Sequence, residues 1–151
     1  MRLRALIVLL FTAVSLGTAL PASADVAADK VRIENFATGR ALDTDVQGNV
    51  FSNPAQPNKF QKWVLEDAGH DTVRIRNVAT GRYLESNETG TVYTSPRFVY
   101  TYQKWIIHKA GAGTRRIENL ATGFVLDTDR AGYVFTNAEY PTNTQRWILE
   151  D

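Results

Sequence analysis

The sequence predicts an all-β domain made of three in-register repeats of 42 residues. A Gln-x-Trp signature occurs three times in the 151 residues, with its tryptophans at positions 63, 105 and 147. An asparagine, a leucine followed by an acid, and two glycines recur at the same interval, as Asn35, Leu42, Asp43, Gly39 and Gly48 in the first copy. A period of this length that fills a chain predicts a repeat architecture before any local pattern is considered.

Each repeat begins with a predicted strand and a turn. Residues 31–34 alternate apolar and polar side chains, which is typical of a strand with one buried face. An Asn-x-Ala-Thr-Gly turn follows, in which the glycine permits a positive φ and the asparagine side chain can bond nearby backbone amides. The three turns span residues 35–39, 77–81 and 119–123.

Three more short strands complete each repeat, and all are rich in the β-branched and aromatic residues that favour strands. The second strand of the first repeat is predicted at residues 41–43, the third at 50–52 after a glycine turn, and the fourth at 63–65. A polar, proline-containing loop precedes the fourth strand. No stretch of the mature chain has a helical periodicity, so we expect twelve strands and no helix.

Three such repeats favour a β-trefoil with pseudo-threefold symmetry, because one repeat cannot bury its apolar face alone and closure around an axis removes exposed sheet edges. The tryptophans could be platforms for a ligand, but each precedes an apolar run, so the core is the favoured interpretation. By the same reasoning, we expect the signature glutamines to tie a loop to the backbone.

The chain start predicts export. Arg2 and Arg4 precede a mostly apolar run, and residues 22–24 form a small-residue cleavage site. We therefore expect a signal peptide at 1–24, a flexible lead at 25–30 and one domain at 31–151, with repeats at 31–72, 73–114 and 115–151. The mature protein would be secreted and extracellular, with no membrane association after cleavage.

Composition excludes several functions. Without the signal peptide the chain has 15 basic and 16 acidic residues, so it has no general attraction for nucleic acid. It has no cysteine, and its two histidines, His70 and His108, lack an evident serine and acid partner. Asp45 and Asp129 each follow the repeated acid by two residues, but calcium needs more oxygen ligands than this. We expect no cofactor, no metal and no enzyme activity.

The three Gln-x-Trp repeats resemble the ricin B-type lectin domain, a β-trefoil family that binds sugars. Within it, residues 79–105 are most similar to the actinohivin-type lectins, which bind high-mannose glycans. This resemblance implies a sugar pocket in each repeat, made of an acid, a tyrosine after Gly-x-Val, a loop amide and a tyrosine before the glutamine.

Mapped onto this chain, the implied carbohydrate-binding residues differ between repeats. They are Asp43, Phe51, Gln56 and Phe60 in the first, Glu85, Tyr93 and Tyr102 in the second, and Asp127, Phe135 and Tyr140 in the third. No repeat keeps the full set. The acid follows a leucine and can accept hydrogen bonds from two adjacent sugar hydroxyls, while a ring packs on the sugar's apolar face.

Three function classes remain open. The favoured one is a secreted, monomeric carbohydrate-binding protein whose partners are glycans or polysaccharides. The second is a trefoil whose sugar sites have decayed into a protein-interaction scaffold. The third is a protease inhibitor, for which Lys59-Phe60 and Arg97-Phe98 are candidate reactive bonds.

Overall fold

The computed structural model describes residues 28–151, and these form twelve strands and three short 3₁₀ helices. The predicted signal peptide and residues 25–27 of the predicted lead lie outside the described residues. The first strand begins at Lys30, which pairs with Val64, so the domain starts one residue before the predicted boundary. Within residues 28–151, no helix is long and apolar enough to span a membrane.

Each repeat contributes four strands and one 3₁₀ helix. The first repeat contains β1 (Lys30–Asn35), β2 (Arg40–Thr44), β3 (Val50–Pro54), η1 (Lys59–Gln61) and β4 (Trp63–Asp67). The second contains β5 (Val73–Asn77), β6 (Tyr83–Ser86), β7 (Val92–Ser95), η2 (Thr101–Gln103) and β8 (Trp105–Lys109). The third contains β9 (Arg115–Asn119), β10 (Val125–Thr128), β11 (Val134–Asn137), η3 (Asn143–Gln145) and β12 (Trp147–Glu150). The 3₁₀ helices are a correction to the helix-free expectation, because three residues are too few to produce a helical period.

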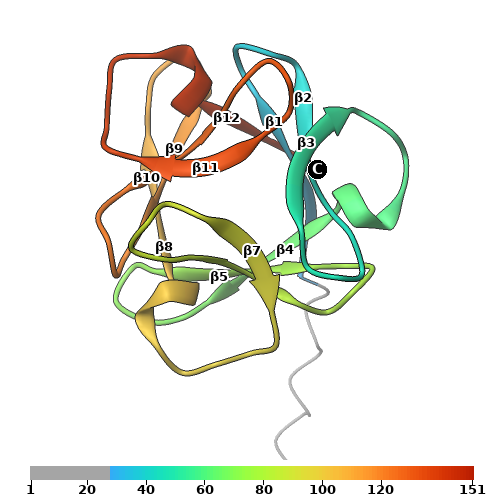
Figure 1. Cartoon of the computed structure of the whole chain (residues 1–151), viewed down its shortest axis with the longest axis vertical. Coiled ribbons are helices and arrows are strands. Elements are labelled where there is room, and N and C mark those ends of the chain that lie inside the picture. Colours follow the sequence, from blue (N-terminus) through green and yellow to red (C-terminus); the bar gives the residue numbers. More distant parts are fainter. Residues whose placement is uncertain (1–27) are drawn as a thin grey trace, which may run out of the picture.

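Six of the strands close into a barrel. Each of β1, β4, β5, β8, β9 and β12 pairs antiparallel with the next, and β12 pairs with β1 to close the ring. The other six strands form the hairpins β2–β3, β6–β7 and β10–β11, which appear as three lobes around one centre in Figure 1. Closure leaves the barrel without a free edge. The predicted β-trefoil with three in-register repeats is confirmed.

The three hairpins contact one another through their glycine turns. The N–H of Ser52, Thr94 and Thr136 donates to the carbonyl of Gly132, Gly48 and Gly90, at 2.9, 2.8 and 2.9 Å. Each of these glycines has a positive φ, and a Cβ added there would lie 2.5 Å from a carbonyl oxygen of the neighbouring hairpin. The turns must therefore be glycine for conformation and for space.

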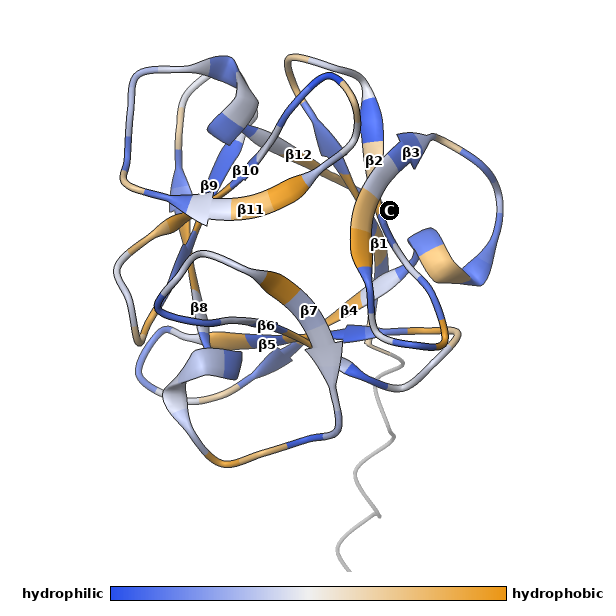
Figure 2. Cartoon of the chain, in the orientation of Figure 1, coloured by the Kyte–Doolittle hydropathy of each residue, from blue (hydrophilic) through white to orange (hydrophobic). Residues whose placement is uncertain are grey.

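The core repeats with the sequence. Apart from Val31, every residue of the buried cluster occupies one of four repeat positions, represented in the second repeat by Ile75, Leu84, Val92 and Trp105. In Figure 2 the hydrophobic parts of β3, β7 and β11 lie around the centre of the molecule. All three tryptophans are completely buried, and each indole N–H donates to the carbonyl of the repeated leucine. The core interpretation of the tryptophans is confirmed.

The turn asparagines join neighbouring repeats. Asn77 is completely buried; its Oδ1 accepts from the N–H of Ala79 and Thr80, and its Nδ2 donates to the carbonyl of Phe60 at 2.8 Å. Asn35 and Asn119 make the equivalent bonds. The asparagine therefore fixes both its own turn and the 3₁₀ helix that precedes the tryptophan strand.

Candidate functional site

The repeated acids lie at the same structural position in each hairpin. Asp43, Glu85 and Asp127 are the next-to-last residues of β2, β6 and β10. Each is paired across its hairpin with the predicted aromatic residue, which is Phe51, Tyr93 or Phe135. The acids are only 7%, 4% and 5% exposed. The sequence therefore places a carboxylate and a ring side by side, with the carboxylate nearly buried.

The glutamine of each Gln-x-Trp signature holds this acid. The Nε2 of Gln61, Gln103 and Gln145 donates to the carboxylate of its own repeat at 3.0, 3.0 and 3.1 Å. The same nitrogen donates to a loop carbonyl, and Oε1 accepts a loop N–H at 2.8 Å. The prediction that these glutamines tie a loop to the backbone is confirmed, and they also fix the acid.

In the first repeat the acid lies at a hollow of about 360 Å³. Phe51 and Phe60 line it, together with the amides of Asn53 and Asn58. Asp43 Oδ1 accepts from the Thr44 N–H at 2.8 Å, and Oδ2 accepts from Asn53 and Gln61. A carboxylate has about four acceptor positions, so about one on Asp43 remains for a ligand.

The structure places Gln56, the predicted loop amide of the first repeat, outside the hollow. The side chain of Gln56 is exposed and does not line the hollow. Its backbone N–H points inward instead and donates to Gln61 Oε1. Asn58 supplies an amide instead; it caps the start of η1, and its Oδ1 accepts from the N–H of Gln61, the last residue of that helix. An asparagine three residues before the glutamine is a typical helix-capping signal, and it could have indicated this position.

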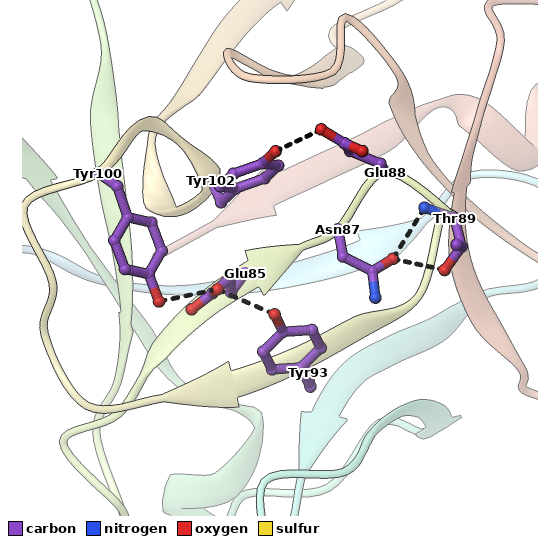
Figure 3. Close-up of a pocket in the computed structure, with 7 residues that line it drawn as sticks. All are labelled: Glu85, Asn87, Glu88, Thr89, Tyr93, Tyr100 and Tyr102. Atoms are coloured by element: carbon purple, nitrogen blue, oxygen red, sulfur yellow. Dashed lines mark hydrogen bonds between the residues drawn. The ribbon is translucent and has the colours of Figure 1, made fainter.

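The second repeat has a larger hollow of about 660 Å³, in which Glu85, Tyr93 and Tyr102 come together as predicted from the resemblance (Figure 3). Glu85 already accepts four hydrogen bonds. Oε1 accepts from the hydroxyls of Tyr93 at 2.9 Å and Tyr100 at 3.1 Å, and Oε2 accepts from Ser95 and Gln103. All its acceptor positions are therefore occupied within the protein.

Tyr100 is a site residue that the sequence reasoning missed. Its ring stacks on Phe98 at 5.0 Å between centroids and meets Tyr102 edge-on at 6.0 Å. The alternation of Phe98, Tyr100 and Tyr102 in the loop is the signal that could have identified it. Burial, with the hydrogen bond to Glu85, raises the pKa of Tyr93 to about 12 and also raises the pKa of Tyr100, so both phenols stay neutral donors near pH 7.

The third repeat keeps the acid, but the aromatic side chains around it differ from those of the first two repeats. Asp127 Oδ1 accepts from the Thr128 N–H and Oδ2 from Gln145, so about two acceptor positions remain. Phe135 stacks on Tyr133, with 5.7 Å between ring centroids. Tyr140 is 53% exposed, while its backbone N–H donates to Gln145. Tyr140 therefore occupies the same outward position as Gln56.

The residue two positions after each acid stabilises the glycine turn. Asp45 accepts the backbone N–H and the side-chain amide of Asn49, Asn87 accepts the N–H of Thr89, and Asp129 accepts the N–H of Tyr133. The Asn49 side chain, aided by backbone N–H groups, lowers the pKa of Asp45. Among residues 28–151, no group of three His, Asp or Glu side chains could hold a metal ion.

Solved structures with the same architecture are similar to the chain. ThreeFoil, a designed threefold-symmetric protein, is 21% identical with a TM-score of 0.76, over 81% of this chain and 98% of its own. SeviL, solved with the asialo-GM1 saccharide, is 18% identical with a TM-score of 0.70, over 81% and 96%. An exo-β-1,3-galactanase from Clostridium thermocellum is 20% identical with a TM-score of 0.76, over 87% of this chain but only 31% of the enzyme. At these identities the likeness shows the fold.

A family model identifies the chain more directly. No curated protein sequence matches it. The model described as ricin-type β-trefoil lectin domain-like matches residues 59–139, which is more than half of the chain. The matched region contains two of the three Gln-x-Trp signatures and the whole of the second repeat's hollow. The chain therefore belongs to the ricin-type β-trefoil lectin domain-like family.

Proposed function

We propose that the protein is a secreted, non-catalytic, monomeric carbohydrate-binding protein with up to three shallow sugar sites. One observation carries this proposal. In every repeat, the glutamine that defines the fold signature holds a nearly buried carboxylate beside an aromatic ring. Family membership and the similarity to SeviL, which was solved with a saccharide, support it.

The geometry suits a pyranose in the first repeat. The acceptor position left on Asp43 can take one sugar hydroxyl, and the Nδ2 of Asn58 can donate to another. The rings of Phe51 and Phe60 offer apolar faces to the C–H face of the sugar. Because Gln61 holds Asp43 before the ligand arrives, the sugar does not have to order the acid on binding.

The hydrogen bonds that the acids accept favour sugar binding over sugar hydrolysis. A glycosidase pair needs one carboxylic acid that can give up a proton and one free carboxylate. Both oxygens of Asp45, the second acid of the first hollow, accept from Asn49, and its pKa is lowered. In the second hollow, every acceptor position of Glu85 is occupied. Asp45 and Glu85 therefore serve as hydrogen-bond acceptors within the protein and do not form such a pair.

We further propose mannose-type glycans as the ligand class. The resemblance to the actinohivin-type lectins supports this choice, and the first hollow keeps the acid Asp43 beside rings at both aromatic positions of that pattern, Phe51 and Phe60. Each site would be weak alone, because it is open to water. Several sites on one rigid body can raise overall binding by about 10²–10⁴ where the glycan spans them.

Replacing the acids one at a time tests the function. Asp43→Asn and Asp127→Asn should each weaken retention on a mannan column, because each removes a charge-assisted bond to a sugar hydroxyl, and the expected loss is roughly tenfold in affinity. The double variant should lose more than either single variant. Frontal chromatography on immobilised mannan measures this, without calcium and at physiological salt.

Asp67→Asn is the matched control, because among the described residues its side chain accepts only the Gly69 N–H, in the turn between β4 and β5, and it lines neither hollow. A mannan column that fails to retain wild type would refute the mannose assignment. Failure on every glycan of an array would instead favour the decayed-scaffold alternative. The saturated carboxylate of Glu85 is the observation that favours that alternative for the second repeat.

Secretion has a separate test. If the signal peptide is cleaved after the small-residue site, the protein recovered from culture medium should begin at Asp25. Intact-mass analysis of the secreted chain measures this directly. Cell-bound protein that still begins at Met1 would contradict the proposal.

A further inference from the structure

The hollow of the second repeat holds two carboxylates that are not paired with a cation. Glu85 and Glu88 both line it, and neither takes part in any salt bridge found within residues 28–151. The positions equivalent to Glu88 are Val46 in the first repeat and Arg130 in the third. Two carboxylates without a cation therefore face this hollow. The first hollow also has two, Asp43 and Asp45, but both oxygens of Asp45 accept from Asn49, whereas only one oxygen of Glu88 accepts from the described residues.

Three tyrosines form the sides of the same hollow, as Figure 3 shows. Tyr93 and Tyr100 donate to the same oxygen of Glu85, and Tyr102 donates to Glu88 Oε1 at 2.7 Å. The rings of Tyr100 and Tyr102 are inclined by 72°. Aromatic rings set at an angle around a hollow attract cations through their electron-rich faces.

The hydrogen bonds of this hollow disfavour a neutral sugar. Glu85 has no acceptor position left for a hydroxyl, because four protein donors occupy it. Its negative charge nevertheless remains and attracts a cation without needing a free lone pair. Glu88 Oε2 accepts no hydrogen bond from the described residues, so it can accept one from an ammonium group.

We propose that the hollow of the second repeat binds a glycan unit carrying a positively charged ammonium group, that is, a protonated amino sugar. This inference rests on the proposed carbohydrate-binding function and names the ligand of one of its sites. The ammonium group lies between the tyrosine rings and donates to Glu88, while Glu85 supplies charge from the floor. Sugars with a carboxylate are repelled by the same two acids.

The proposal predicts a preference between two ligands that share a backbone. Wild type should bind a glucosamine oligomer roughly three- to tenfold more tightly than the matching N-acetylglucosamine oligomer at pH 6, because acetylation removes the charge. Glu88→Gln, which keeps the shape of the side chain, should reduce this ratio toward one. Isothermal titration calorimetry measures both affinities, and thermal melting checks that the variant is folded.

Arg130→Gln is the matched control, since it changes the charge at the equivalent position of the third repeat, and it should leave the ratio high. Equal affinity of wild type for both oligomers would overturn the amino-sugar assignment, even if retention on neutral glycans upholds the proposed function. Choline that competes as strongly as glucosamine would overturn it too, because the hollow would then recognise any organic cation. An amino-sugar preference that persists in Glu88→Gln would also contradict the proposal.

Discussion

Trp105→Ala should lower the free energy of unfolding by about 3–5 kcal/mol, the usual cost of deleting a large buried aromatic side chain. Trp105 is completely buried, and its indole N–H donates to the Leu84 carbonyl at 3.0 Å. The substitution leaves both a cavity and a buried carbonyl without its donor. Small domains are stable by only about 5–15 kcal/mol, so the variant should lose a large share of its stability.

Chemical denaturation of two comparison variants separates the contributions. Trp105→Phe keeps most of the ring volume but loses the N–H, so it should cost about 1–3 kcal/mol. Val99→Ala is the surface control, because Val99 is 86% exposed and should change stability by at most about 0.5 kcal/mol. If Trp105→Ala were as stable as Val99→Ala, the tryptophan would not support the core in the way its burial implies.

The sequence predicted the fold well because symmetry supplied the long-range information. A single strand pattern does not say which strands pair, but residues recurring every 42 positions must occupy equivalent environments. The sequence therefore predicts that Trp105, which precedes an apolar strand, lies in the core and that Asn77 lies in a turn. The strand ends were less accurate: β4 runs to Asp67, two residues past its predicted end, because antiparallel pairing with β5 continues through polar side chains.

The site was only partly predictable. The pairing of Glu85 with Tyr93 follows from the two-residue alternation of a hairpin whose turn is fixed by Gly90. Tyr100 and Asn58 lie in irregular loops, whose side-chain directions have no period that a sequence could display. The saturation of Glu85 was also hidden, because its four donors come from β7, from η2 and from the loop between them.

The repeats share one scaffold and differ in the ligand-facing positions. Leu84 and Gln103 have exact counterparts in the other two repeats, since they build the core and hold the acid. Tyr100 and Glu88, which line the hollow, have none. Different ligand preferences in the three repeats are therefore compatible with one fold, because changes at these positions leave the tryptophan and glutamine contacts in place.

Gly90→Ala should cost about 2–5 kcal/mol of stability, for two separable reasons. Gly90 has φ +83°, a left-handed conformation that costs a residue with a Cβ about 1–2 kcal/mol. The new Cβ would also lie 2.5 Å from the Thr136 carbonyl oxygen, and relieving such an overlap costs about a further 1–3 kcal/mol. The hairpin β6–β7 would have to move away from β11, although Thr136 donates to the Gly90 carbonyl at 2.9 Å.

Comparison with Gly81→Ala separates the two reasons. Gly81 has φ +69°, close to that of Gly90, but a Cβ there meets no atom within 4 Å, so only the conformational cost of about 1–2 kcal/mol applies. In denaturant melts, the free energies of unfolding of the two variants should differ by the cost of the overlap, about 1–3 kcal/mol. Equal losses would mean that the hairpins separate without cost and do not brace one another. Because Gly90 follows Glu88 and Thr89, which line the hollow, a displaced turn should also weaken ligand binding by the second repeat, whereas Gly81→Ala should spare it.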